Sequence, residues 1–161
     1  MGVRTNVVAV AAGLGAIVLA GCGGGGGSSA TTAQRKQTTT PASAGGATLT
    51  VKMSEFAFAP KNATASAGKV KVTAPNVGKV EHELVLFKTN RDPGSFKVSG
   101  DRVDEEALEE ASGVREIGEI ADVEAGETKS ETFKLTPGKY VMICNLPGHY
   151  KAGMYGSITV Q

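Results

Sequence analysis

The sequence is poor in several residue types on which protein function often depends. Its 161 residues include no tryptophan, only two histidines and two cysteines, and 5% aromatic residues. A core must therefore be built mostly from Val, Leu, Ile, Ala and a few Phe. The formal net charge is only +1, so the charge balance gives no reason to expect a nucleic-acid partner.

A long hydrophobic run is also missing. The most apolar stretch, residues 7–20, is too short for the roughly 20 residues of a membrane-spanning helix, but it suits a signal peptide. It ends in Leu19-Ala20-Gly21-Cys22, which resembles the lipobox of bacterial lipoproteins. The resemblance implies that residues 1–21 are a lipoprotein signal peptide and that Cys22 carries lipid at the new N-terminus. An ordinary secretory signal with an incidental cysteine is the alternative.

Residues 22–46 are mostly Gly, Ser, Thr and Ala, a composition that predicts a flexible tether. The folded domain is therefore predicted to occupy residues 47–161. We expect an extracytoplasmic protein that its lipid anchors to a bacterial membrane, in the periplasm or on the outer cell surface. If Cys22 is lipidated, Cys144 has no partner for a disulfide, and a metal would explain why a lone thiol is kept in an oxidising compartment.

Residues 47–161 show the alternation of apolar and polar residues that is typical of half-buried strands. Turn signals such as Pro75-Asn76-Val77-Gly78 and Thr136-Pro137-Gly138 separate these runs, which favours an antiparallel sandwich. The predicted strand faces include Leu49, Val51 and Met53; His82, Leu84 and Leu86; and Tyr140, Met142 and Cys144.

One segment interrupts this pattern. Residues 101–124 hold ten acidic and two basic residues. Apolar residues at helical spacing predict a short helix from about Val103 to Ala111, ended at Gly113. The helix could be a solvated cover over one edge of the sandwich, or an acidic docking face for a basic partner.

The strongest chemical signal lies near the C-terminus, where Cys144, His149 and Met154 follow one another at five-residue steps. Thiolate and thioether ligands favour copper, and imidazole binds it as well. The chain has one other histidine, His82, in a strand-like run. Two His, one Cys and a weak Met are the ligand set of a blue-copper electron-transfer site. Because a strand ends at Cys144 and the next begins near Met154, one loop can present three of these ligands.

Residues 47–161 resemble the cupredoxins, the blue-copper fold of plastocyanin, azurin and rusticyanin. The residues that carry the resemblance are His82, Cys144, Pro147-Gly148-His149 and Gly153-Met154, and the spacing is most similar to the rusticyanin and auracyanin type. The resemblance implies an all-β Greek-key sandwich of about eight strands with one type 1 copper at one end. It also implies that the edge of His149 passes the electron through a small apolar rim, for which Leu146, Pro147 and Tyr150 are candidates, with Lys151 beside them.

The sequence departs from the family at one position. Many cupredoxins have Asn directly after the first His ligand, where it ties loops together, but here the residue is Glu83. The resemblance therefore does not predict what the Glu83 side chain binds.

The resulting hypothesis is a monomeric, membrane-tethered electron carrier that docks with redox proteins, as donor and acceptor, in membrane complexes. A copper chaperone, scavenger or resistance protein is the alternative. An enzyme of the copper nitrite reductase kind would need a second copper with several His, and both histidines of this chain are already ligands. We therefore expect no catalytic activity.

Overall fold

A computed structural model describes residues 46–161 of the chain. The predicted signal peptide, the predicted lipidation site Cys22 and all of the predicted tether except Gly46 lie outside the described residues. No helix in the described part is long and apolar enough to cross a membrane.

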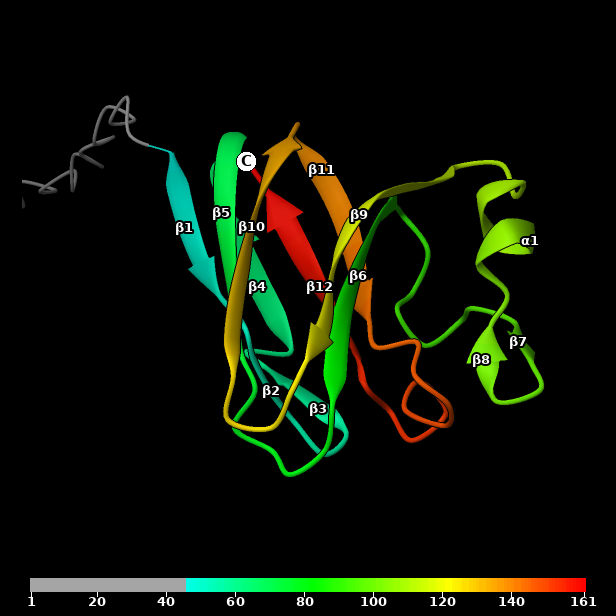
Figure 1. Ribbon diagram of the computed structural model, residues 1–161. Helices are drawn as coiled ribbons and strands as arrows, with labels where there is room; N and C mark the ends of the chain where they lie inside the picture. The colour runs from blue at the N-terminus through cyan, green and yellow to red at the C-terminus, as the bar shows by residue number, and fades with distance from the viewer. Residues whose placement is uncertain (1–45) are drawn as a thin grey trace, which may run out of the picture. The chain divides into compact units, whose positions relative to one another are not determined.

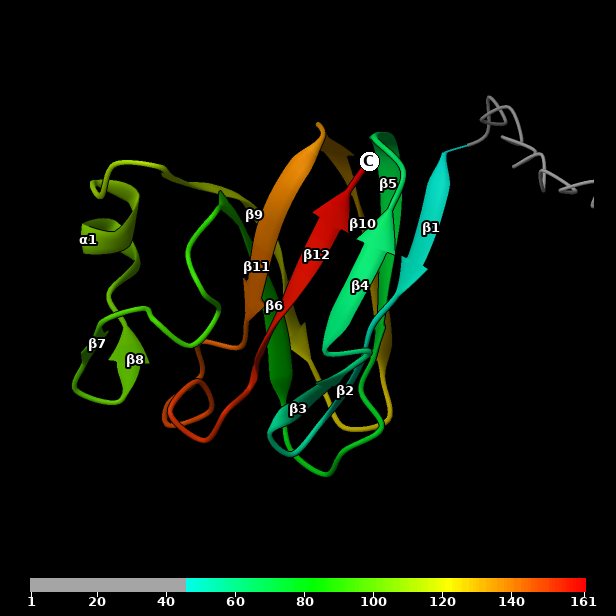
Figure 2. The same cartoon turned by 180° about the vertical axis from the view of Figure 1, so that it is seen from behind.

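Two sheets pack against each other to form the sandwich (Figures 1 and 2). The three-stranded sheet has the order β1-β5-β10, and the five-stranded sheet has the order β4-β12-β11-β6-β9. These eight strands match the predicted number. The strands of the first sheet are β1 (Ala47–Thr50), β5 (Gly68–Pro75) and β10 (Thr128–Leu135). Those of the second are β4 (Asn62–Ala65), β12 (Tyr155–Val160), β11 (Gly138–Ile143), β6 (His82–Thr89) and β9 (Val114–Val123).

The sandwich is mixed rather than purely antiparallel. The strand β1 pairs in parallel with β5, and β4 pairs in parallel with β12, while the other pairs of the two sheets are antiparallel. Two short ribbons complete the β structure: β2 (Lys52–Ser54) with β3 (Ala57–Ala59), and β7 (Val98–Ser99) with β8 (Arg102–Val103).

The main core lies between the inner faces of the two sheets, as the predicted parity requires. Leu84 and Leu86 of β6 face this core together with Met142 and Cys144. The alternate residues of the same strands, such as Val85, Phe87, Val141 and Ile143, face a second core on the outer side of the five-stranded sheet. The strand β6 is therefore apolar on both faces, which explains its almost continuous hydrophobic run.

The second core is covered by residues 90–113, which we call the excursion, between β6 and β9. It contains β7, β8 and the helix α1 (Glu105–Glu109). The helix is shorter than the predicted segment 103–111: Asp104 is its N-cap and accepts a hydrogen bond from the Ala107 N–H at 3.0 Å. Leu108 packs inward into the second core.

The second half of the acidic segment is the strand β9, which the sequence analysis did not predict. Its residues do not alternate cleanly, because the pairing of β6 with β9 shifts register at two points. Gly118, at φ +141°, lies at one of these shifts. The four carboxylates at positions 116, 119, 122 and 124 thus belong to or directly follow a strand, not a helical excursion.

Candidate metal centre

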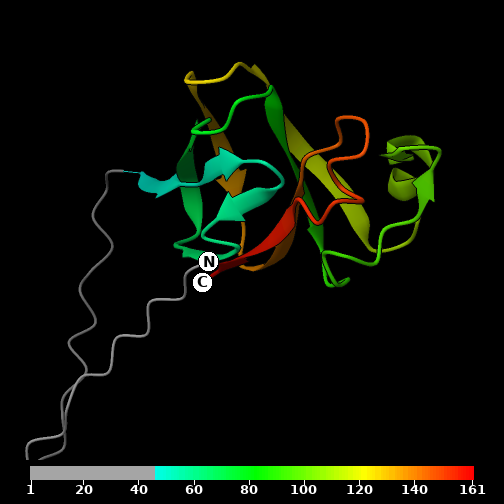
Figure 3. The same ribbon diagram turned by 90° about the horizontal axis from the view of Figure 1, so that it is seen from below.

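The four predicted ligands come from three neighbouring elements at one end of the sandwich, which we call the site end. His82 is the first residue of β6, Cys144 directly follows β11, and Met154 directly precedes β12. Because β11 runs antiparallel to both β6 and β12, the start of β6, the end of β11 and the start of β12 meet. The ligand loop, residues 144–154, connects β11 to β12 at this end (Figures 1 and 3).

Three ligand atoms converge on one point. The Nδ1 atoms of His82 and His149 are 3.3 Å apart, and the Cys144 Sγ lies 3.2 Å from the His149 Nδ1. All three lie within 4.8 Å of one another. Ligand atoms bound at 2.0–2.3 Å to one ion in a trigonal arrangement would be about 3.5 Å apart, so the cluster has the size of a metal site.

Met154, the fourth predicted ligand, is joined to the other loop ligands by backbone hydrogen bonds. The Cys144 N–H donates to the Met154 carbonyl and the Met154 N–H donates to the His149 carbonyl, both at 3.1 Å. Its side chain is fully buried in the main core with Cys144. Two imidazoles, one thiol and one thioether therefore meet as sequence analysis predicted.

Two glycines allow the ligand loop to turn back so sharply. Gly148 has φ +81° and Gly153 has φ +105°, a region in which side chains are strained. The turn that begins at Leu146 is closed by a hydrogen bond from the His149 N–H to the Leu146 carbonyl at 3.0 Å. The positive φ of Gly148 agrees with the expectation that Pro147-Gly148 shapes the turn after Cys144.

Burial favours the uncharged form of the three titratable ligands, His82, His149 and Cys144. Burial lowers the pKa of His82 and that of His149 from 6.5, so both rings are neutral at pH 7. Burial raises the pKa of the Cys144 thiol from 9.0 to about 11, although the N–H groups of Glu83 and Leu146 bond to its sulfur and oppose this rise. A metal must therefore displace one thiol proton and no imidazolium proton at neutral pH.

Glu83, the residue directly after the first His ligand, ties the site together. Its carboxylate Oε1 accepts the Asn145 N–H at 2.8 Å, and its own N–H bonds to the Cys144 sulfur. Burial raises the pKa of Glu83, while the Asn145 N–H opposes that rise. A side-chain hydrogen bond between the two ligand segments is thus present with a different residue.

His149 is the ligand that reaches the surface. Its side chain is half-buried, whereas those of His82, Cys144 and Met154 are buried. The Phe56 ring packs edge-on against the imidazole, with centroids 4.9 Å apart. We call Phe56, which is 41% exposed, and the exposed Pro147, which lies two residues before His149 in the ligand loop, the apolar patch.

The predicted rim is corrected at one residue. Tyr150 is only 4% exposed, because its ring lies in the second core and its hydroxyl donates to the Pro93 carbonyl at 2.8 Å. Leu146 is half-buried against the main core, and Pro147 is exposed. Sequence reasoning missed Phe56, because no local pattern signals that it packs against a ligand distant in the sequence.

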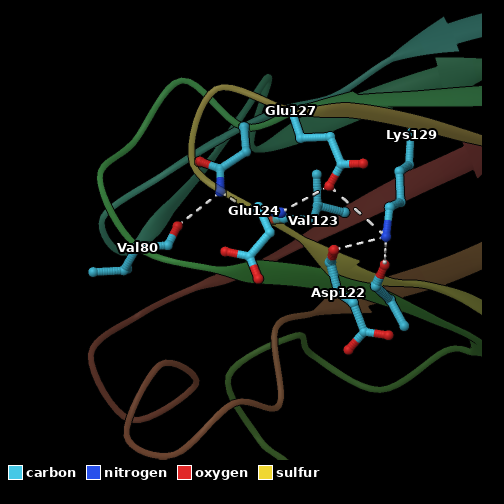
Figure 4. A network of polar contacts seen from close by, with 8 residues as sticks. Val80, Asp122, Val123, Glu124, Glu127 and Lys129 are labelled. Atoms are coloured by element: carbon cyan, nitrogen blue, oxygen red, sulfur yellow. Dashed lines mark hydrogen bonds and ion pairs between the residues drawn. The ribbon is translucent and has the colours of Figure 1, made fainter.

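A network of polar contacts holds the other loops of the site end, as Figure 4 shows around Val80, Val123 and Lys129. Asn76, 2% exposed, donates to the carbonyls of Val80 and Val123 at 2.7 and 2.8 Å and accepts the Gly78 N–H at 2.9 Å. Val123 is the β9 partner of His82. The network therefore anchors the strand ends on which the first histidine ligand lies.

Fold and site together define a small copper protein. Residues 30–161 match the family of copper binding proteins described as the plastocyanin/azurin family. The chain belongs to this family, and His82, Cys144, His149 and Met154 are arranged as a type 1 copper site.

Auracyanins are among the individual proteins to which the chain is similar. Auracyanin-B of Chloroflexus aurantiacus is 54% identical over 41 residues, which are 25% of this chain and only 17% of that relative. The dithionite-reduced auracyanin of Roseiflexus castenholzii is 26% identical, covers 73% of this chain and 99% of its own, and has a TM-score of 0.55. Auracyanin A of Chloroflexus aurantiacus, a "blue" copper protein, is 27% identical over 73% of this chain and 100% of its own, with a TM-score of 0.53.

Proposed function

We propose that this protein is a one-electron carrier that exchanges electrons with other proteins through His149. The observation that carries the proposal is a complete ligand set in which three side chains are buried and only His149 reaches the surface. When bound, copper supplies a Cu(I)/Cu(II) couple that takes one electron from a donor protein and gives it to an acceptor.

The surroundings of His149 support brief encounters with a partner. The apolar patch places Phe56 directly against the imidazole, so a partner that covers the patch would exclude water beside the ligand. Small redox interfaces bury less than about 1,200 Å². Lys151, which is exposed two residues after His149, adds a charge that would bias the choice of partner.

The site does not support catalysis at the metal. Two imidazoles, a thiolate and a buried thioether leave no place for a substrate, and both histidines of the chain are already used. We infer that the protein is not an enzyme.

We further propose that the lipid on Cys22 anchors the protein, as a monomer, outside the cytoplasm on a bacterial membrane, where membrane redox complexes are its partners. Gly46, the first described residue, packs against the Lys69 backbone, where an added Cβ would meet the Lys69 carbonyl at 2.7 Å. Lys69 lies near the start of β5, and β5 runs about 20 Å from there to the site end. An anchor attached through Gly46 would leave His149 free.

The optical spectrum of the copper-loaded protein tests electron-carrier function. We expect an intense thiolate-to-copper absorption band in the visible region, reversible one-electron reduction, and loss of the band in Cys144→Ser. A chaperone would instead transfer copper to a chelator within minutes, so rapid release together with slow electron exchange would refute the carrier proposal.

The anchor has a separate test. Cell fractionation should place the protein with membranes, and mass spectrometry should find acyl chains on Cys22. Cys22→Ser should release the protein to the soluble extracytoplasmic fraction. An unmodified Cys22 in a soluble wild-type protein would contradict the anchor and leave the copper site unaffected.

A further inference from the structure

The excursion is an insertion that the sandwich does not need for its topology. The strands β6 and β9 are antiparallel neighbours, paired from His82 to Thr89, and a hairpin of this kind can close with two to five residues. Here residues 90–113 connect them, and none of these residues is a ligand. Viewed from below, the ligand loop lies between the sandwich and the excursion (Figure 3).

The excursion and the ligand loop are joined by hydrogen bonds that resemble strand pairing. The Gly148 N–H donates to the Asp101 carbonyl at 2.8 Å. The Asn145 side-chain oxygen accepts the Val103 N–H at 2.6 Å, and its NH₂ group donates to the Val103 carbonyl at 2.9 Å and to Glu105 Oε1 at 2.6 Å. Asn145 is only 5% exposed, so these bonds are shielded from water.

Asn145 also connects the excursion to the segments that carry two of the three buried ligands. It directly follows Cys144, and its N–H donates to Glu83 Oε1, which directly follows His82. Sideways movement of Cys144 would therefore strain bonds to the excursion and to β6 at once. Asn145 therefore links the excursion to the segments that carry His82 and Cys144.

A second contact fixes the loop beside His149. Tyr150 accepts the Phe96 N–H at 2.9 Å through its hydroxyl and donates to the Pro93 carbonyl. Its ring stacks on that of Phe96 at 13° between planes, with centroids 6.2 Å apart. The excursion thus holds Asn145, which directly follows Cys144, and Tyr150, which directly follows His149.

We propose that the excursion is a positioning element for the copper site and that Asn145 is the positioning residue through which it acts. Cu(II) left to itself favours tetragonal coordination, so the arrangement of the thiolate and the loop imidazole depends on how firmly the loop is held. The excursion holds the ligand loop by hydrogen bonds on one side, and the main core packs against Cys144 on the other. The part of the acidic segment that belongs to the excursion, residues 101–113, is then a structural support of the site.

The test compares full-length, copper-loaded Asn145→Ala with two controls. Asn62→Ala removes the same side chain where its oxygen accepts the Ser157 hydroxyl and no group of the ligand loop or the excursion. Val160→Ala trims the main core near the opposite end and serves as the destabilised control. We expect only Asn145→Ala to change the intensity ratio of the thiolate-to-copper bands and the copper hyperfine splitting in the electron paramagnetic resonance spectrum.

A measurement on the metal-free protein reports the same contact without copper. The Gly148 amide should exchange its hydrogen about tenfold faster in Asn145→Ala than in either control, because the bond to Asp101 is held by the adjoining contacts. A variant that is less stable but keeps the wild-type spectrum and exchange rate would overturn the inference, since the excursion would then only add stability.

If Asn145→Ala does not fold, Tyr150→Phe decides, because it removes one hydroxyl and keeps the ring. We expect faster exchange at the Phe96 and Gly148 amides and a smaller spectral change in the same direction. Unchanged values for both would overturn the inference. The inference rests on the copper site alone: slow electron transfer by the wild-type protein would refute the carrier function and leave these comparisons valid.

Discussion

The pH dependence of copper binding gives a quantitative test of the buried site. Copper binds the Cys144 thiolate, but burial raises the pKa of this thiol from 9.0 to about 11. Below that pH, each bound Cu(I) must release one proton, while the two histidines release none because their pKa values are lowered from 6.5. The dissociation constant should therefore fall about tenfold per pH unit above pH 7.

The informative range lies between pH 9 and pH 11. An ordinary thiol of pKa 9.0 would be ionised by then and the affinity would level off, whereas a thiol of pKa about 11 should give roughly 100-fold further tightening. The assay is anaerobic competition with a chromophoric Cu(I) chelator whose own pH dependence has been calibrated. Cys144→Ser should bind more weakly and lose this slope.

The same shift affects folding, which supplies a control. A raised pKa means that the folded metal-free domain holds the thiol proton more tightly than the unfolded chain does. The stability that this provides is complete below pH 9.0 and is lost as the pH rises through about 11. Circular dichroism at each pH must show a folded domain. An affinity that levels off near pH 9 would refute the reasoning, and a slope of two between pH 7 and pH 9 would show that a histidine is still protonated.

Three substitutions test the remaining structural claims. Asn76→Ala should lower the free energy of unfolding by about 2–3 kcal/mol in urea denaturation, because it leaves the buried Val123 carbonyl without its donor; a loss below about 1 kcal/mol would contradict this. Phe56→Ala should slow electron self-exchange several-fold and keep the thiolate band, and an unchanged rate would exclude the apolar patch as the contact surface. Gly156→Ala should cost at least about 2 kcal/mol, since the new Cβ would clash with the Lys61 carbonyl of a paired strand; wild-type stability would show that this edge can move.

The ligand set was predictable because most of its information is local. Cys144, His149 and Met154 lie on one loop whose ends are set by strand alternation and by Pro and Gly. With only two histidines in the chain, the remaining ligand could be assigned to His82. The β-sandwich followed from the same alternation, the count of about eight strands from the resemblance to the cupredoxins, and the short helix from its apolar spacing and from Gly113.

What failed depends on contacts that are distant in the sequence. Tyr150 was expected at the surface, but the excursion covers it, and no pattern near Tyr150 reveals that cover. Phe56 reaches His149 from a turn in another part of the chain. The strand β9 was missed because its register shifts hide the alternation by which strands are recognised.

The sequence by itself therefore determined which atoms would bind copper and on which class of fold, since ligand chemistry and strand periodicity are properties of short segments. Only the tertiary structure decided how those atoms are held and exposed. It placed Glu83 against Asn145, Asn145 against Val103, and Phe56 against His149. Such contacts depend on which strands become neighbours, and that is settled when the whole core packs.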